Sequence, residues 1–116
     1  MSDFLENWVS KIRTGDPKQV VDLYHMNGLL LGTFSDKERI GHDLILEYFK
    51  NLLKSKVDVE IISEHTHESE SLVTNSGLYN FIVDDKIVNA RFSFVFIKNE
   101  NNWKILSHHS SVLPES

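Results

Sequence analysis

Residues 87–97 read Ile-Val-Asn-Ala-Arg-Phe-Ser-Phe-Val-Phe-Ile, and this stretch decides the fold class. Successive side chains of a β-strand point to opposite faces of a sheet. One face of this strand is apolar throughout and carries Val88, Ala90, Phe92, Phe94 and Phe96. The other face is polar only in its middle and carries Ile87, Asn89, Arg91, Ser93, Val95 and Ile97. A face in water should be polar along its whole length, so the pattern indicates that both faces of the sheet are covered.

The segments around this strand have the same two-residue period. A strand begins at Val57, and residues 71–83 and 103–113 form two more, so the second half of the chain reads as an antiparallel meander. The triplet Asn75-Ser76-Gly77 interrupts one of these segments. We interpret it as a bulge or bend in one long strand, because glycine inside a strand often marks one, and a tight turn that splits the segment is the alternative.

The first half of the chain has the spacing of helices. One apolar stripe at helical period consists of Phe4, Leu5, Trp8, Val9 and Ile12. Asp16-Pro17 supplies an N-cap and a first helical residue for a second helix. A third helix is indicated by Leu44, Ile45, Tyr48, Phe49, Leu52 and Leu53. Between the second and third helices we expect a short buried strand over 28–34 and a polar loop over 35–41.

These elements predict one α+β domain over residues 1–116, with three N-terminal helices packed on one face of a strongly curved antiparallel sheet. Helices on one side leave the other side of the sheet without cover. The most economical cover is a second copy of the chain, which predicts a homodimer or higher homo-oligomer. In that assembly we assign Phe92, Phe94 and Phe96 to the interface.

Composition excludes several classes of function. A net charge of −5 makes the chain a poor general binder of nucleic acid or of an anionic membrane. The absence of cysteine excludes disulfides, thiolate metal sites and cysteine nucleophiles. No targeting segment is visible and no apolar run is long enough to span a bilayer, so we expect a soluble, cytoplasmic protein.

Arg91 is the most informative single residue, because an arginine on a central strand is costly to bury without a partner. It either forms a structural ion pair or lies at an edge, or it binds an anion at the bottom of a cavity, where its planar fork suits a carboxylate or phosphate. The final strand carries a polar patch, Ser107-His108-His109-Ser110-Ser111, whose two histidines face opposite ways. Such patches are typical of functional cavities, although side chains that satisfy one another would look the same.

Several motifs together resemble a known family. They are Trp8 with Gly15-Asp16-Pro17, Leu30-Leu31-Gly32-Thr33-Phe34, Ile45-x-x-Tyr48-Phe49, Gly77-Leu78-Tyr79-x-Phe81, Ala90-Arg91-Phe92-Ser93-Phe94-Val95-Phe96, and Trp103-Lys104-Ile105 with His108-His109-Ser110-Ser111-x-x-Pro114. In this order they are similar to bacterial homologues of the association (hub) domain of calcium/calmodulin-dependent protein kinase II. That domain belongs to the nuclear transport factor 2-like and SnoaL-like superfamily, which includes polyketide cyclases and ketosteroid isomerases.

The resemblance implies a cystatin-like cone with a pocket at its open end and dimers formed through the outer face of the sheet. It also implies a site for a small carboxylate, and matching motif positions assign pocket roles to Arg91, Tyr79 and His109, with Thr33 and Tyr48 as further members. Ser110 stands where the kinase hub has an arginine. The kinase domain and its calmodulin-binding segment are absent from the sequence, so no kinase activity is inferred.

Three functions follow as hypotheses. The first is an oligomeric domain that binds a small anionic or partly apolar ligand in an arginine-containing pocket. The second is an isomerase, dehydratase or cyclase in which His109 acts as general base beside Tyr79 and Arg91. The third is a pure oligomerisation module. We expect no cofactor and no metal, although His65 and His67 share a strand face, because charged and hydroxyl residues surround that pair as at an exposed strand end.

Overall fold

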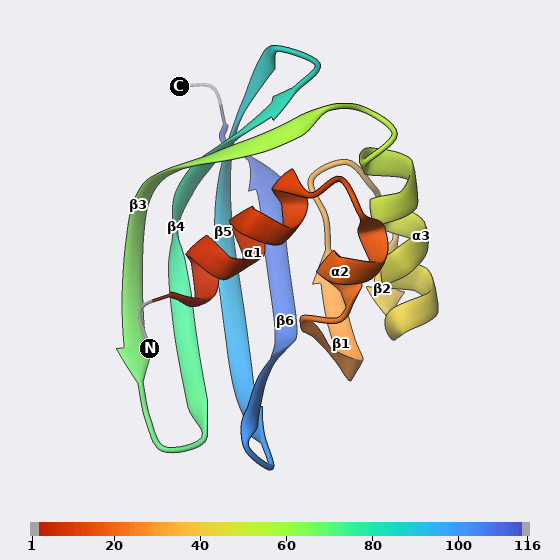
Figure 1. Ribbon diagram of the computed structural model, residues 1–116. Coiled ribbons are helices and arrows are strands. Elements are labelled where there is room, and N and C mark those ends of the chain that lie inside the picture. The colour runs from red at the N-terminus through yellow and green to blue at the C-terminus, as the bar shows by residue number, and fades with distance from the viewer. Residues whose placement is uncertain (1–2, 115–116) are drawn as a thin grey trace.

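The computed structural model describes residues 3–114, in which three helices pack against a six-stranded sheet (Figure 1). The helices are α1 (Phe4–Arg13), α2 (Pro17–Val21) and α3 (His42–Leu52). The strands are β1 (Tyr24–Leu31), β2 (Glu38–Ile40), β3 (Val57–Glu68), β4 (Leu72–Val83), β5 (Lys86–Asn99) and β6 (Asn102–Val112). They lie in the order β2-β1-β6-β5-β4-β3. Within the described residues, no helix has both the length and the apolarity needed to cross a membrane.

The α+β class is confirmed, with two corrections to the expected arrangement. β1 pairs with β6 in parallel, so the sheet is mixed rather than antiparallel. α3 follows β1 and β2 in the chain, so the three helices are not all N-terminal to the sheet. In addition, part of the expected loop over 35–41 forms the short edge strand β2. The parallel pairing of β1 and β6 could not be predicted, because the residue pattern of one strand carries no information about the direction of its neighbour.

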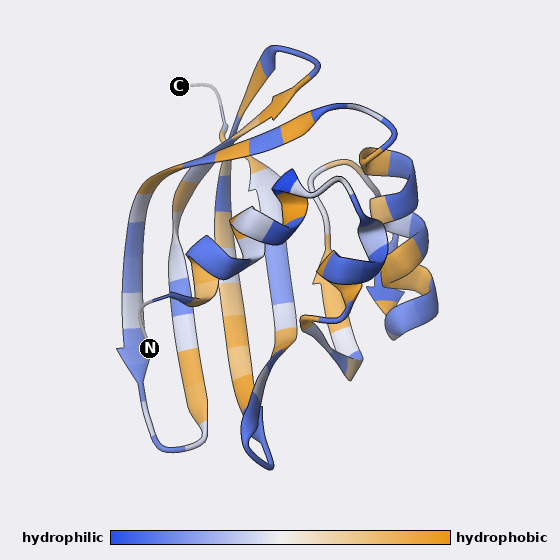
Figure 2. Ribbon diagram, viewed as in Figure 1, coloured by the Kyte–Doolittle hydropathy of each residue, from blue (hydrophilic) through white to orange (hydrophobic). Residues whose placement is uncertain are grey.

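α1 forms because its apolar residues recur at helical spacing, and it buries that stripe against the sheet. Leu5, Trp8 and Ile12 are each at most 1% exposed, and Figure 2 shows hydrophilic residues between them along the helix. Gly15 follows the helix with a φ of 73°, a conformation that glycine adopts without strain. The side chain of Asp16 then accepts a hydrogen bond of 3.0 Å from the backbone of Lys18, which caps the start of α2.

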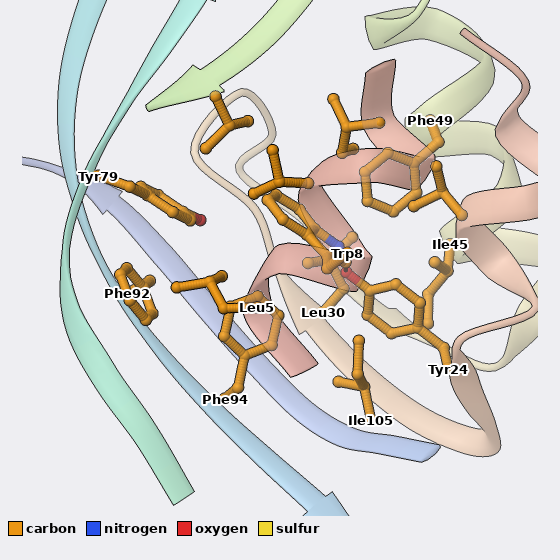
Figure 3. Packing of buried hydrophobic residues seen from close by; sticks show 14 of the residues in the cluster. Leu5, Trp8, Tyr24, Leu30, Ile45, Phe49, Tyr79, Phe92, Phe94 and Ile105 are labelled. Carbon is orange, nitrogen blue, oxygen red and sulfur yellow. Dashed lines mark hydrogen bonds between the residues drawn. The ribbon is translucent and has the colours of Figure 1, made fainter. Parts of the chain in front are cut away.

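The apolar face of β5 points inward, toward α1. Phe92, Phe94 and Phe96 are 4%, 0% and 3% exposed. Trp8 of α1 packs edge-on against Phe94, with 5.5 Å between the ring centroids, and Figure 3 shows both rings inside the core. The assignment of these three phenylalanines to an interface between copies is therefore wrong, because all three are buried in the core of the same chain. The alternation alone could not choose the inner face, since both faces of the strand have apolar ends.

β4 is one continuous strand, so the predicted long strand over 71–83 is confirmed. The irregularity lies in the facing strand, where the register of β3 shifts between Ile61 and Ser63. The shift brings the backbone of β3 so close to Gly77 that a Cβ at that position would collide with the carbonyl oxygen of Ser63. Gly77 therefore permits the bulge in its neighbour rather than forming one itself.

Candidate functional site

The sheet separates the predicted ligand-binding residues into two groups. Tyr79 points inward and is 0% exposed, while Thr33 and Tyr48 line a pocket at one end of the molecule. Arg91 and His109 are exposed and lie together on the outer face. The placement of Arg91 at the bottom of an enclosed cavity is therefore wrong. Its neighbours on β5 are buried, and the alternation of a strand then directs the guanidinium outward.

A chain of side-chain hydrogen bonds runs through the core and ends at Tyr79. Nε1 of Trp8 donates to the hydroxyl of Tyr24 at 3.2 Å, and that hydroxyl lies 2.8 Å from Nδ1 of His108. Nε2 of His108 lies 3.2 Å from the hydroxyl of Tyr79. Figure 3 shows Trp8 between the labelled residues of β4 and β5 and the ring of Tyr24. The inward-facing histidine of the final strand is therefore His108, and both of its ring nitrogens already have partners.

His108 is neutral at physiological pH. Burial, and to a smaller extent the nearby His109, lowers the pKa of His108 to about 3. Burial also raises the pKa of Tyr24 and of Tyr79 well above the ordinary value of a tyrosine, so both keep their hydroxyl protons. A neutral imidazole has one N–H donor and one acceptor. Each of these groups therefore donates one hydrogen bond, and this identifies the donor at each contact between them.

The chain of hydrogen bonds is directed toward the end of the molecule that carries Thr33. Tyr79 donates to Oγ of Ser110 at 2.5 Å, so Tyr79 accepts from His108 rather than donating to it. The proton of Ser110 is then free to reach Oγ1 of Thr33, which also lies 2.5 Å away. Within residues 3–114 the Thr33 hydroxyl then has no acceptor for its own proton. Either hydroxyl can donate in the contact between Ser110 and Thr33, and when Ser110 donates, the Thr33 proton is available to the space beside it.

A pocket of about 810 Å³ lies beside Thr33, and we call it the mouth pocket. Its lining consists of Thr33, Phe34, Ser35, Asp36, Lys37, Arg39, Tyr48, Asn51, Leu52 and Ser55. The ring of Phe34 packs edge-on against Phe81 of β4 at 5.2 Å, and the backbone N–H of Phe34 donates to the hydroxyl of Tyr48 at 3.3 Å. Burial raises the pKa of Tyr48 to about 12, so this hydroxyl stays protonated. The pocket therefore combines aromatic surface with neutral hydroxyl groups.

Arg39 brings a guanidinium to this pocket, is only 7% exposed and has its charge balanced by an ion pair with Glu47. Its Nη1 lies 2.7 Å from Oε1 of Glu47 and 3.1 Å from the carbonyl oxygen of Leu44, and its Nη2 donates to Oγ of Ser35 at 3.3 Å. The guanidinium also lies 5.8 Å from the centroid of the Tyr48 ring. Within residues 3–114, Nε of Arg39 has no hydrogen-bond partner.

Sequence reasoning missed Arg39, because this arginine lies in a segment interpreted as a polar loop. Its ion-pair partner Glu47 is on α3, and no local spacing in the sequence connects the two residues. Hydrogen bonding to Arg39 lowers the pKa of Glu47 below the ordinary value, so the pair is charged at neutral pH. The lining of the mouth pocket then contains two cations, Lys37 and Arg39, and one carboxylate, Asp36.

A second cleft, of about 540 Å³, lies on the outer face of the sheet. We call it the outer cleft, and its lining consists of Ser63, His65, Gly77, Leu78, Arg91, Phe92, Ser93, His109 and Ser111. Arg91 and His109 share this cleft, whereas Tyr79, which the resemblance groups with them in one pocket, lies on the other side of the sheet. Within the described part of the chain, no group of three histidine, aspartate or glutamate side chains is arranged to hold a metal ion.

The sequence matches the family model described as "SnoaL-like domain" over residues 1–115. None of the curated proteins matches the chain. Among solved structures, a Xanthomonas campestris protein named as a calcium/calmodulin-dependent protein kinase II association domain is 31% identical, with a TM-score of 0.93 over 99% of this chain and 86% of that chain. This similarity agrees with the motifs quoted from the sequence.

More distant structures share the fold. A Streptomyces avermitilis protein, named as a dehydratase of the nuclear transport factor 2-like family, is 12% identical with a TM-score of 0.87 and covers 98% of this chain and 94% of that chain. A Nostoc punctiforme protein of unknown function with a cystatin-like fold is 11% identical with a TM-score of 0.81 and covers 97% of this chain and 88% of that chain. At these identities the similarity establishes the fold alone.

Proposed function

The chain belongs to the SnoaL-like family, and on that premise we propose that it binds a small carboxylate with an apolar body in the mouth pocket. The observation that carries the proposal is the pocket of about 810 Å³ in which a buried arginine, Arg39, and a hydroxyl donor, Thr33, line the same space as Phe34. Ligand sites in proteins are concave and largely apolar, with a few polar groups that fix orientation.

The carboxylate end of the ligand would lie near Arg39 and Lys37. A guanidinium in a partly desolvated site binds a carboxylate more strongly than the same group in water, because the local dielectric constant is lower. Arg39 is held by Glu47 on one side and by the Tyr48 ring on another, so its fork is already oriented before a ligand arrives. Such preorganisation reduces the entropy lost on binding.

The Thr33 hydroxyl would supply a second polar contact. With Ser110 as the donor to Thr33, the Thr33 proton is available to an acceptor atom of the ligand. Phe34 and Leu52 supply apolar surface for the rest of the ligand. The side chain behind Thr33 is the neutral Ser110. The resemblance to the kinase hub would place an arginine at this position.

Binding can be tested with benzoate as the probe and benzyl alcohol as a neutral molecule of the same shape. Benzoate should raise the melting temperature of the wild type in a saturable way, and benzyl alcohol should do so less. The Lys37→Gln and Arg39→Lys variants should weaken the benzoate shift, whereas Arg13→Gln should not, because Arg13 pairs with Asp58 away from this pocket. A wild type that benzoate does not stabilise would contradict the proposal.

Turnover has weaker support than binding. His109, the expected general base, lies on the outer face and away from Tyr79. The histidine inside the core, His108, has both nitrogens engaged and a pKa of about 3, which makes it a poor base at neutral pH. We therefore propose a binding role and not an enzymatic one.

We also propose that copies of the chain associate through the outer face of the sheet. The support is apolar side chains exposed toward the ends of this face, Leu72 at 40% and Ile87 at 65%, together with the similarity to a protein named as an association domain. Light scattering should find a dimer or larger species for the wild type. Leu72→Glu and Ile87→Glu should reduce it, and Met26→Glu, on β1, should not. A wild type that stays monomeric at high concentration would contradict this proposal.

A further inference from the structure

The charges in the lining of the mouth pocket that have no ion-pair partner cancel each other. Arg39 is already balanced by Glu47, with 2.7 Å between Nη1 and Oε1. The other charged residues of the lining are Lys37 and Asp36. Within residues 3–114, neither of these two side chains forms a hydrogen bond or an ion pair. Besides the Arg39–Glu47 pair, the described lining therefore offers one cation and one carboxylate to a ligand.

A ligand with a carboxylate as its only charge leaves half of this arrangement unused. Lys37 and Arg39 attract the carboxylate, but the same pocket contains Asp36, whose charge has the same sign as that of the ligand. The net charge of the chain, −5, adds a general repulsion of anions. A ligand that carries both a carboxylate and an ammonium group has no net charge, so the chain does not repel it as a whole. Its ammonium group also gives Asp36 a partner.

The different burial of the charged groups sets the direction of such a ligand. Arg39 is 7% exposed, whereas Asp36 is an exposed residue of the loop between β1 and β2. The carboxylate then lies at the inner end of the pocket and the ammonium group at its rim. The apolar body lies between them, against Phe34 and Leu52. A pocket of about 810 Å³ is large enough for an aromatic ring with a charged group at each end.

We propose that the ligand of the mouth pocket is a zwitterion, a carboxylate that carries an ammonium group at the opposite end of its apolar body. This inference rests on the proposed function, because it names the class of ligand for the same pocket. Arg39 and Lys37 bind the carboxylate, and Asp36 binds the ammonium group. Because Asp36 is exposed, water and salt screen its ion pair, which therefore adds a modest preference to the binding supplied by the carboxylate and the apolar body.

Two probes with the same ring and the same carboxylate test the ammonium group. 4-(Aminomethyl)benzoate is a zwitterion at pH 7, and 4-methylbenzoate is its counterpart without the amine. Calorimetric titration of the full chain at low ionic strength should show that the zwitterion binds about threefold or more tightly, which corresponds to one exposed ion pair. The preference should shrink as salt is added, because salt screens a pair at the rim.

The Asp36→Asn variant should lose the preference, and it should bind 4-methylbenzoate more tightly than the wild type because a like charge is removed. Asp36 is exposed and its side chain has no partner within residues 3–114, so this variant should keep the wild-type fold. Glu38→Gln changes the net charge equally and is the matched control. Glu38 borders a smaller recess that Asp36 also lines, but it does not line the mouth pocket, so Glu38→Gln should keep the preference.

The outcomes separate the zwitterion from the carboxylate site itself. Equal binding of the two probes by the wild type, a preference that survives in Asp36→Asn, or an equal loss of preference in Glu38→Gln would overturn the zwitterion and leave the carboxylate site in place. A wild type that binds neither probe would overturn the carboxylate site, and the zwitterion with it.

Discussion

The imidazole of His108 stacks on the ring of Phe94, with 3.9 Å between the centroids and 14° between the planes. The two residues are directly opposite on β6 and β5, and both point into the core. A histidine in this position is neutral, because a charged imidazole would lose its hydration against an aromatic ring with no carboxylate among its hydrogen-bond partners. This contact joins the aromatic core to the chain of hydrogen bonds that reaches the mouth pocket.

Stability should therefore fall as the pH is lowered below the pKa of an unfolded histidine, about 6.5. The folded pKa of His108 is lowered to about 3, so between these two values the unfolded chain binds a proton that the folded chain does not. The free energy of unfolding should then decrease by up to about 1.4 kcal/mol per pH unit in this window. Urea unfolding between pH 5 and pH 6.5 measures the effect above the range in which carboxylates titrate.

The matched pair for this measurement is His108→Gln and His109→Gln. The first should remove the slope between pH 5 and pH 6.5, and the second should keep it, because His109 is exposed on the other face of the same strand. If the slope is the same in wild type and His108→Gln, another group is responsible and the neutral state of His108 is not what sets the acid sensitivity.

Removing the hydroxyl of Tyr79 should destabilise the fold more than removing that of Tyr48. Tyr79→Phe leaves the buried His108 without an acceptor and Ser110 without a donor, at a cost of about 1–3 kcal/mol. Tyr48→Phe removes one bond of 3.3 Å from the backbone of Phe34, which should cost about 0.5–1.5 kcal/mol. Chemical denaturation of the two variants compares them directly, and an equal or reversed order would show that the fold tolerates unsatisfied groups in the buried chain.

Phe94→Ala should act on stability and not on assembly. Phe94 is 0% exposed and packs on Trp8 and Phe96, so truncation leaves a cavity and should cost about 3–5 kcal/mol. Ile87→Ala, on the same strand but 65% exposed, should change the free energy of unfolding by about 0.5 kcal/mol or less. A folded Phe94→Ala protein with wild-type stability and a changed oligomeric state would restore the interface assignment that the structure contradicts.

Gly77→Ala should destabilise the sheet at the bulge of β3. The added Cβ meets the backbone of Ser63, and a backbone atom cannot move aside as the end of a side chain can. The overpacking should cost about 1–3 kcal/mol. Thr74→Ala, at an exposed position of the same strand, is the control and should have little effect. A neutral Gly77→Ala substitution would mean that β3 can move away at this point without loss of pairing.

The sequence by itself determined the class of fold and most of its elements. The helical stripe of Leu5, Trp8 and Ile12 and the two-residue period of β5 are local patterns, and the physics of helices and strands connects such patterns directly to burial. The motifs quoted from the tail and from β5 also sufficed to identify the family, which the match over residues 1–115 confirms. These results depend on residues that are neighbours in the chain or repeat at a fixed spacing.

Only the tertiary structure decided which face of β5 points inward, because both faces carry apolar residues and the choice depends on where α1 lies. That decision placed Arg91 and His109 on the outer face and Tyr79 inside, so residues expected to line one pocket lie on opposite faces of the sheet. It also revealed Arg39, whose partner Glu47 comes from α3 and whose guanidinium lies over the ring of Tyr48. Contacts between distant segments depend on how the elements pack, and no spacing within one segment encodes them.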